Sequence, residues 1–110
     1  MSISWADFVK IDLRAGTITK AEIFKEARKP SIKLWIDLRD LGIKKSSAQL
    51  AALCDPVNLI GRQVICVVNF EPKQIANFIS EVLVTGFPDR ENRILLSSIE
   101  RLVPNGSRLF

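Results

Sequence analysis

The sequence predicts an all-β fold, a small barrel built mainly from strands, and three patterns carry that prediction. Residues 32–39 carry an aliphatic side chain at every second position, as a strand does when one of its faces is buried. Residues 64–68 form an uninterrupted apolar run rich in β-branched side chains, which suits a strand buried on both faces. Residues 13–24 alternate with a change of phase near Gly16, which indicates a β-bulge in a long, coiled first strand.

A short helix is expected before the first strand, from about Trp5 to Lys10. Ser4 and Asp7 have the spacing of a capping box, and Trp5 and Phe8 would lie on one side of the helix. So short a helix is marginal by itself, so we expect it to pack on the barrel or on a partner chain.

The second strand is the clearest element in the chain. Its even-numbered positions from Ile32 to Leu38 are all apolar and are expected to face the core, whereas its odd-numbered positions face outward. Trp35 is one of the outward side chains. The pattern leaves open whether it is a stacking platform, a subunit contact or a half-covered surface residue.

The other strands are shorter. We expect a third strand over residues 44–50, a fourth over the apolar run, and a fifth over residues 81–85. A helical turn bounded by Pro56 and Gly61 separates the third strand from the fourth. Five strands with a helical turn at this point match the oligonucleotide/oligosaccharide-binding (OB) barrel, although periodicity alone does not fix that topology.

A C-terminal extension follows the barrel. It holds a short strand over residues 94–97 and a turn at Pro104-Asn105-Gly106. The chain then ends in Leu109 and Phe110, an apolar terminus that we expect to dock against another surface.

Composition describes an ordinary folded domain. The chain has 110 residues, of which 47% are hydrophobic and 25% charged, so we expect one ordered domain over residues 1–110. No apolar run reaches the length of a membrane span, and the N-terminal residues do not read as a signal peptide. We therefore expect a cytoplasmic protein without a membrane partner.

Basic residues are concentrated in one part of the sequence. The net charge is +4, and residues 10–45 contain ten basic and five acidic side chains. If this segment forms one face, it is an electrostatic footprint for a polyanion. A solvated face with interspersed acids is the alternative that charge counting leaves open.

The residues needed for most catalytic and metal chemistry are missing from the sequence. There is no histidine, no glycine-rich phosphate loop and no pair of cysteines at metal-ligand spacing. Cys66 lies in the apolar run and is expected to be a core residue, whereas Cys54 is expected to be partly exposed. We therefore expect a binding protein with no catalytic residue, metal or cofactor.

The segment between the last two barrel strands is rich in amides, with one base. It carries Asn69, Lys73 and Asn77 beside two apolar side chains that look exposed, Ile75 and Phe78. Rigid strands that present such a loop commonly form a binding surface. A plain connection without a special role is equally compatible with the composition.

Several short stretches fall in a recognisable order: Asp12-Leu13-Arg14-Ala15-Gly16, Lys33-Leu34, Ser46-Ser47-Ala48-Gln49, Val67-Val68-Asn69-Phe70, Pro72-Lys73, Ser80 and Val103-Pro104-Asn105-Gly106. Together they resemble the tRNA-binding OB domain found at the ends of some methionyl- and phenylalanyl-tRNA synthetases and in stand-alone tRNA-binding proteins. Within that family the chain is most similar to the CsaA branch of export-related chaperones.

The resemblance implies a five-stranded OB barrel in a homodimer, with residues 1–11 and 94–110 as the dimerisation extensions. The interface residues would be Trp5, Phe8, Leu109 and Phe110. The implied activities are binding of tRNA by its structure, and binding of unfolded or precursor polypeptides. Either could be the main role.

Two candidate surfaces follow. Lysines would contact phosphates, while amides and a hydroxyl would contact sugar, phosphate or an unstacked base. The tRNA patch is Lys33, Asn69, Lys73, Asn77 and Ser80, with Arg14, Lys44 and Lys45 as a weaker rim. The apolar surface for a polypeptide is Trp35, Ile75 and Phe78, and Trp35 is also a weaker candidate for base stacking.

Overall fold

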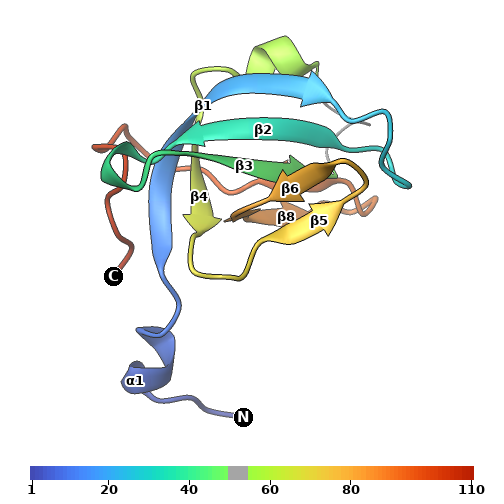
Figure 1. Ribbon diagram of the computed structural model, residues 1–110. Helices are drawn as coiled ribbons and strands as arrows, with labels where there is room; N and C mark the ends of the chain where they lie inside the picture. Colours follow the sequence, from blue (N-terminus) through green and yellow to red (C-terminus); the bar gives the residue numbers. More distant parts are fainter. Residues whose placement is uncertain (50–54) are drawn as a thin grey trace.

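The computed structural model describes residues 1–49 and 55–110, which fold as a nearly closed antiparallel barrel (Figure 1). Five strands form one sheet in the order β3-β2-β1-β4-β7. Their bounds are β1 Leu13–Ile23, β2 Ile32–Asp37, β3 Ile43–Ala48, β4 Gln63–Val67 and β7 Leu83–Val84. The predicted all-β class and the five-stranded OB arrangement are confirmed.

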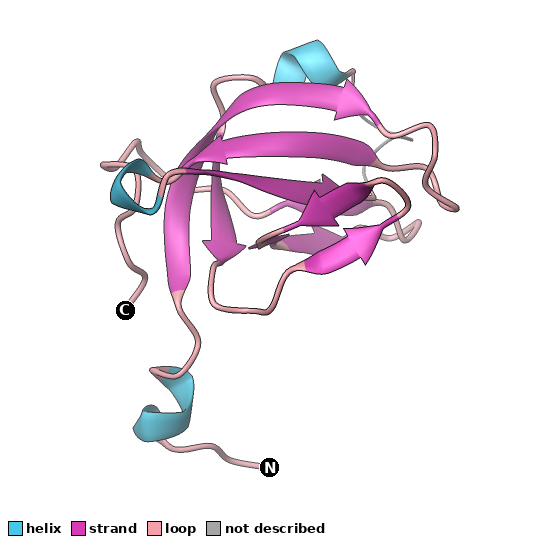
Figure 2. Cartoon of the chain, viewed as in Figure 1, coloured by secondary structure: helices cyan, strands magenta, loops and turns pink. Residues whose placement is uncertain are grey.

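Two small hairpins and three short helices complete the described chain (Figure 2). The hairpins are β5 Lys73–Ile75 with β6 Phe78–Ser80, and β8 Gly86–Pro88 with β9 Ile94–Leu96. The helices are α1 Trp5–Phe8 and two 3₁₀ turns, η1 Arg39–Leu41 and η2 Pro56–Leu59. The predicted capping box of α1 and the predicted helical turn before β4 are both present.

The core lies inside the barrel and follows the predicted alternation of β2. Ile32, Leu34 and Ile36 are fully buried, while Lys33 and Trp35 between them are partly exposed. Fully burying an aliphatic side chain of this size stabilises the fold by about 1.5–3 kcal/mol. These inward residues hold β2 in one register, because a slip of one position would expose all of them.

The barrel closes where β3 meets the segment that leads into β7. The carbonyl oxygen of Lys45 accepts hydrogen bonds from the backbone N–H groups of Glu81 (2.7 Å) and Val82 (3.2 Å). The carboxylate of Glu81 accepts a further bond from the Lys45 N–H at 3.1 Å. These bonds pair backbone groups on the outer edge of β3, which would otherwise be left without partners, as on a free edge strand.

The β-bulge of β1 is not at Gly16, as predicted, but between Ile18 and Lys20, where the pairing with β2 shifts. Pairing with β4 runs through Gly16 without a break. A Cβ at Gly16 would lie 2.7 Å from Cδ2 of Leu38, so the glycine permits a close approach of β1 and β2. After the bulge, Ile23 is 58% exposed and does not join the core as the predicted phase implied.

The predicted loop between the last barrel strands is the β5–β6 hairpin. A two-residue turn, Ala76–Asn77, joins its strands, and Ile75 pairs with Phe78. Phe78 is only 6% exposed, which corrects the expectation that it is a surface residue. The hairpin uses residues up to 80, so β7 is shorter than the strand predicted over residues 81–85.

Other predicted bounds also shift. β3 begins at Ile43 and ends at Ala48, while the expected end of that strand at Leu50 lies outside the described residues, as does Cys54. β8 was not predicted from the sequence. In the described part of the chain, every helix is too short to cross a membrane.

The N-terminal segment and the C-terminal tail meet along β1. Backbone N–H groups of Gly106 and Leu109 donate to the carbonyls of Ala15 (2.7 Å) and Leu13 (2.8 Å). α1 projects away from the barrel beyond the start of β1 (Figure 1), and its Trp5 is 67% exposed.

We expect the substitution Gly16→Ala to destabilise the protein by about 1–3 kcal/mol, because the added methyl group overpacks the contact between β1 and β2. The Cβ would also lie 3.0 Å from the carbonyl oxygen of Asp37, which cannot move aside as a side chain can. Urea denaturation of both proteins measures the difference. An unchanged free energy of unfolding would show that the strands do not need this close approach.

Cys66 should be inert in the folded protein, because it is fully buried and desolvation raises the pKa of its thiol to about 12. In a Cys54→Ala background at pH 8, we expect a disulfide reagent to react with Cys66 only as fast as the protein unfolds. Reaction at the rate of the urea-unfolded chain would contradict this. If the Cys66→Ala protein folds, it should retain the expected binding of tRNA, because Cys66 is not exposed to a ligand.

Candidate nucleic-acid interface

The outer face of β1, β2 and β3 carries lysines at neighbouring positions. Trp35 on β2 pairs with Lys20 on β1 and with Lys45 on β3. Lys33, two residues before Trp35, points to the same side. With strands about 4.8 Å apart and a rise of about 3.4 Å per residue, the three lysine Cα atoms lie about 8–10 Å from one another.

The β5–β6 hairpin adds an aromatic ring to this outer face. β6 lies beside β3 (Figure 1), and Phe78 packs between Phe24 and Trp35. The ring centroid of Phe78 lies 5.4 Å from that of Phe24 and 5.8 Å from that of Trp35, both in edge-to-face orientations. Aromatic pairs prefer this geometry, so the rings hold one another in fixed orientations.

Each of the three lysines places its ammonium group over one or two of these rings. Lys20 Nζ lies 4.5 Å from the Trp35 ring centroid. Lys33 Nζ lies 4.8 Å from Phe24 and 5.3 Å from Phe78, and Lys45 Nζ lies 5.3 Å from Phe78. We call these six residues the basic–aromatic face: Lys20, Phe24, Lys33, Trp35, Lys45 and Phe78.

The charge of this face is only partly neutralised. Lys20 forms an ion pair with Glu22 at 3.2 Å. Within residues 1–49 and 55–110, Lys33 and Lys45 form no ion pair, and their ammonium groups lie over the aromatic rings. These two positive charges are therefore not neutralised by an acidic side chain of the described residues.

Lys33 belongs to the basic–aromatic face, and Asn77 is exposed in the turn that directly precedes its Phe78. Lys73 is exposed on β5, opposite Ser80, where it lines a separate surface pocket. Lys45, predicted as a rim residue, is central because it covers Phe78.

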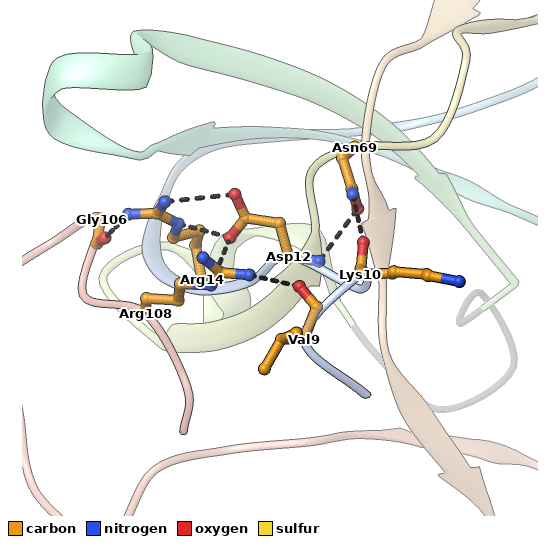
Figure 3. A network of polar contacts seen from close by, with 7 residues as sticks. All are labelled: Val9, Lys10, Asp12, Arg14, Asn69, Gly106 and Arg108. Carbon is orange, nitrogen blue, oxygen red and sulfur yellow. Dashed lines mark hydrogen bonds and ion pairs between the residues drawn. The ribbon is translucent and has the colours of Figure 1, made fainter. Parts of the chain in front are cut away.

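Asn69 and Ser80 have internal roles instead. The Asn69 amide accepts a bond from the Asp12 N–H at 3.0 Å and donates to the Lys10 carbonyl at 2.7 Å (Figure 3). The Ser80 hydroxyl accepts a bond from the Ser47 N–H at 3.3 Å, which ties the hairpin to β3. These polar groups therefore already have partners in the chain, and their place in the predicted patch stays a prediction.

Arg14 and Lys44 do not join the basic–aromatic face. Arg14 lies near the other end of β1, where its Nε donates to the Asp12 carboxylate at 2.6 Å and its Nη1 to the Gly106 carbonyl at 3.0 Å (Figure 3). The hydrogen bond between Arg14 and Asp12 lowers the pKa of Asp12 and raises that of Arg14. Lys44 is paired with Ile36, so it points to the opposite side of the sheet from Lys45, toward Glu81 at 4.0 Å.

The apolar surface predicted for a polypeptide is not formed as expected. Phe78 is buried beneath lysines, and Trp35 and Ile75 are each only partly exposed. A surface pocket of about 320 Å³ lies on another part of the hairpin. Its lining includes Phe70 and Leu83, which are 57% and 48% exposed.

The basic–aromatic face includes two residues that the sequence analysis missed, Lys20 and Phe24. Lys20, Glu22 and Phe24 occupy every second position at the end of β1 and just after it, and this shared face is the signal that could have found them. The phase of this segment could not be assigned correctly, because the bulge lies after Ile18 and not at Gly16.

The four residues predicted for a subunit interface lie together at the ends of the chain. Trp5, Phe8, Leu109 and Phe110 line one pocket of about 190 Å³. Phe110 is fully exposed and Leu109 is 42% exposed. Arg108 also lines the pocket and donates to the carbonyl of Val9 at 2.8 Å (Figure 3), which fixes the tail against the N-terminal segment.

Among the described residues, no group of three or more His, Cys, Asp or Glu side chains is placed so that it could hold a metal ion. The described basic–aromatic face presents lysine ammonium groups, which can donate hydrogen bonds to an anion.

The fold is similar to solved structures of known proteins. A solved structure of the chaperone CsaA from Bacillus anthracis is 45% identical, with a TM-score of 0.93 over 100% of both chains. The CsaA chaperone protein of Picrophilus torridus is 44% identical, with a TM-score of 0.92 over 99% of this chain and 100% of that one.

A relationship to longer proteins is also present. Methionine–tRNA ligase 1 of Bacillus anthracis is 33% identical over 106 residues, which are 94% of this chain and 15% of the ligase. The chain spans less than one-fifth of the length of the curated ligases that it matches. The family model described as "Putative tRNA binding domain" matches residues 13–108. The chain therefore belongs to the tRNA-binding domain family.

Proposed function

We propose that this chain is a non-enzymatic tRNA-binding protein that recognises tRNA by its shape and its phosphate charge. The observation that carries the proposal is the basic–aromatic face, where Lys33 and Lys45 have no acidic partner in the described chain. Family membership supports tRNA as the polyanion. Lysine contacts to phosphates position a nucleic acid and supply affinity, but they carry little sequence information.

The mechanism follows from the rigidity of the face. Its lysines stand on three hydrogen-bonded strands, so their spacing is set before the ligand arrives. Each phosphate that they neutralise releases condensed counterions, which favours association and makes it dependent on salt. A folded tRNA presents phosphates in a fixed arrangement, whereas a flexible chain must be ordered first.

We expect Lys33→Glu and Lys73→Glu each to weaken tRNA binding by about 1–3 kcal/mol, because a favourable charge is removed and a repulsive one is added. Filter binding over a potassium chloride series measures both affinity and salt slope. The slope should flatten by about one for each phosphate that a variant can no longer bind.

Arg90→Glu is the matched control, since Arg90 is exposed in the β8–β9 loop and forms no ion pair with the described residues. Arg93→Glu is a second comparison, although it also breaks the ion pair with Asp89 at 2.9 Å. Equal losses of affinity in all four variants would indicate diffuse attraction without a site. Unchanged affinity in all of them would contradict tRNA binding at this face.

We also propose that the chain forms a homodimer through residues 1–11 and 94–110. Exposed Trp5 and Phe110 beside a shared apolar pocket support this, because a small barrel has little core with which to cover them. Stable obligate interfaces bury about 2,000 Å² or more and are rich in such side chains.

Sedimentation at micromolar concentration should therefore give a dimer, and Phe110→Glu should shift it toward monomer and lower the melting temperature, because association stabilises the folded state. Deleting residues 103–110 should favour monomer and also lower stability, because the deletion removes the tail's hydrogen bonds to β1. Val57→Glu, at a position 64% exposed on η2, is the control. A wild-type protein that sediments only as a monomer would contradict the proposal.

A second candidate function is binding of unfolded or precursor polypeptides. The 45% identity to a protein named as a chaperone supports it, as does the pocket that includes Phe70 and Leu83. Binding of an apolar peptide would give a large negative heat-capacity change with little dependence on salt, whereas tRNA binding would give a steep salt dependence.

A further inference from the structure

The faces of the central rings in the basic–aromatic face are not free for stacking. Phe24 is 2% exposed and Phe78 is 6% exposed, and lysine ammonium groups lie over both. A nucleic-acid base could stack on these rings only after the lysines had moved away. Aromatic residues in a nucleic-acid interface usually serve as stacking platforms, so the covered rings of this protein require a different role.

We propose that Phe24, Trp35 and Phe78 are positioning residues that hold the ammonium groups of Lys33, Lys20 and Lys45 ready for phosphates. This inference rests on the proposed tRNA binding and deepens it. It assigns the face to a phosphate polyanion without contacts between these rings and the bases.

The physical basis is the loss of side-chain freedom when a lysine binds a phosphate. A free lysine side chain samples many rotamers, and binding must restrict them. The negative face of an aromatic ring attracts the ammonium group and restricts it beforehand. A ring contacts the ammonium from one side only, so N–H donors on the other side remain available for phosphate oxygens.

Phe78 is the central residue of this arrangement. It lies beneath both Lys33 and Lys45, whereas Phe24 lies beneath Lys33 alone. Its own orientation is fixed by edge-to-face packing, at 66° to Phe24 and 75° to Trp35. Replacing the Phe78 ring should therefore release the ammonium group of Lys45 and leave that of Lys33 over Phe24 alone, while every charge in the chain stays.

The test compares wild type with Phe78→Leu, using tRNA and inorganic polyphosphate, a polyanion without bases. We expect binding of both ligands to weaken at least two- to fivefold, about the effect of releasing the Lys45 ammonium group, with a smaller further loss at Lys33, which keeps its contact with Phe24. The salt slope should stay unchanged, because the same phosphates are still contacted. Lys33→Ala, in contrast, should lower the slope by about one.

Two variants separate the ring face from simple packing. Phe78→Tyr keeps the ring and should bind like wild type. Phe87→Leu removes an aromatic ring that is 70% exposed on β8 and lies under no lysine in the described structure, so it should change nothing. If Phe78→Leu does not fold, Trp35→Leu replaces it as the test, because Trp35 is only partly buried and holds Lys20 alone.

The outcomes are distinct. Loss of affinity for tRNA but not for polyphosphate would indicate base stacking and overturn the inference. Unchanged affinity in Phe78→Leu, or an equal loss in Phe78→Tyr, would overturn it as well, while salt-dependent tRNA binding by wild type would leave the proposed function standing. Failure of wild type to bind tRNA would instead contradict the proposed function itself.

Discussion

Closure of the barrel at Lys45 is the constraint on which the candidate site depends. The carbonyl of this residue accepts the N–H groups of both Glu81 and Val82, so the chain that follows the β5–β6 hairpin is fixed against β3. The hairpin then has to lie on the outer face of the sheet, with Phe78 directed toward Phe24 and Trp35. The same residue therefore closes the core and, through its side chain, contributes a charge to the surface.

This arrangement resolves a conflict between burial and charge. Large aromatic rings on an outer face favour being covered, and ammonium groups lose hydration if they are buried. Lysine satisfies both conditions, because its apolar stem covers the ring while its charged end stays near water. Lys33 over Phe24 and Phe78 is the clearest case. The same lysine side chains therefore cover the aromatic rings and give the face its positive charge.

At the opposite end of β1, the Asp12 carboxylate holds two separate segments of the chain together. It binds Arg14 at 2.6 Å and lies 3.5 Å from Arg108, so it links the first strand to the C-terminal tail (Figure 3). Asn69 holds the backbone that leads into Asp12, through the Lys10 carbonyl and the Asp12 N–H. Basic residues near this end thus serve to fix the chain termini, whereas those on the basic–aromatic face have charge left for a ligand.

The sequence by itself determined the elements whose pattern depends only on neighbours in the chain. The alternation that forms β2, the α1 capping box and the turn before β4 are local, and each was predicted, although β2 ends at Asp37 and Arg39 begins a 3₁₀ turn. The family resemblance also named Lys33 as a candidate, and this residue lies on the basic–aromatic face. Tertiary structure alone decided which polar groups are free, because Asn69, Ser80 and Arg14 are engaged by residues distant in sequence. It also decided that Phe78 is buried and that Lys20 and Phe24 share its face, since a bulge sets their phase and a hairpin covers them.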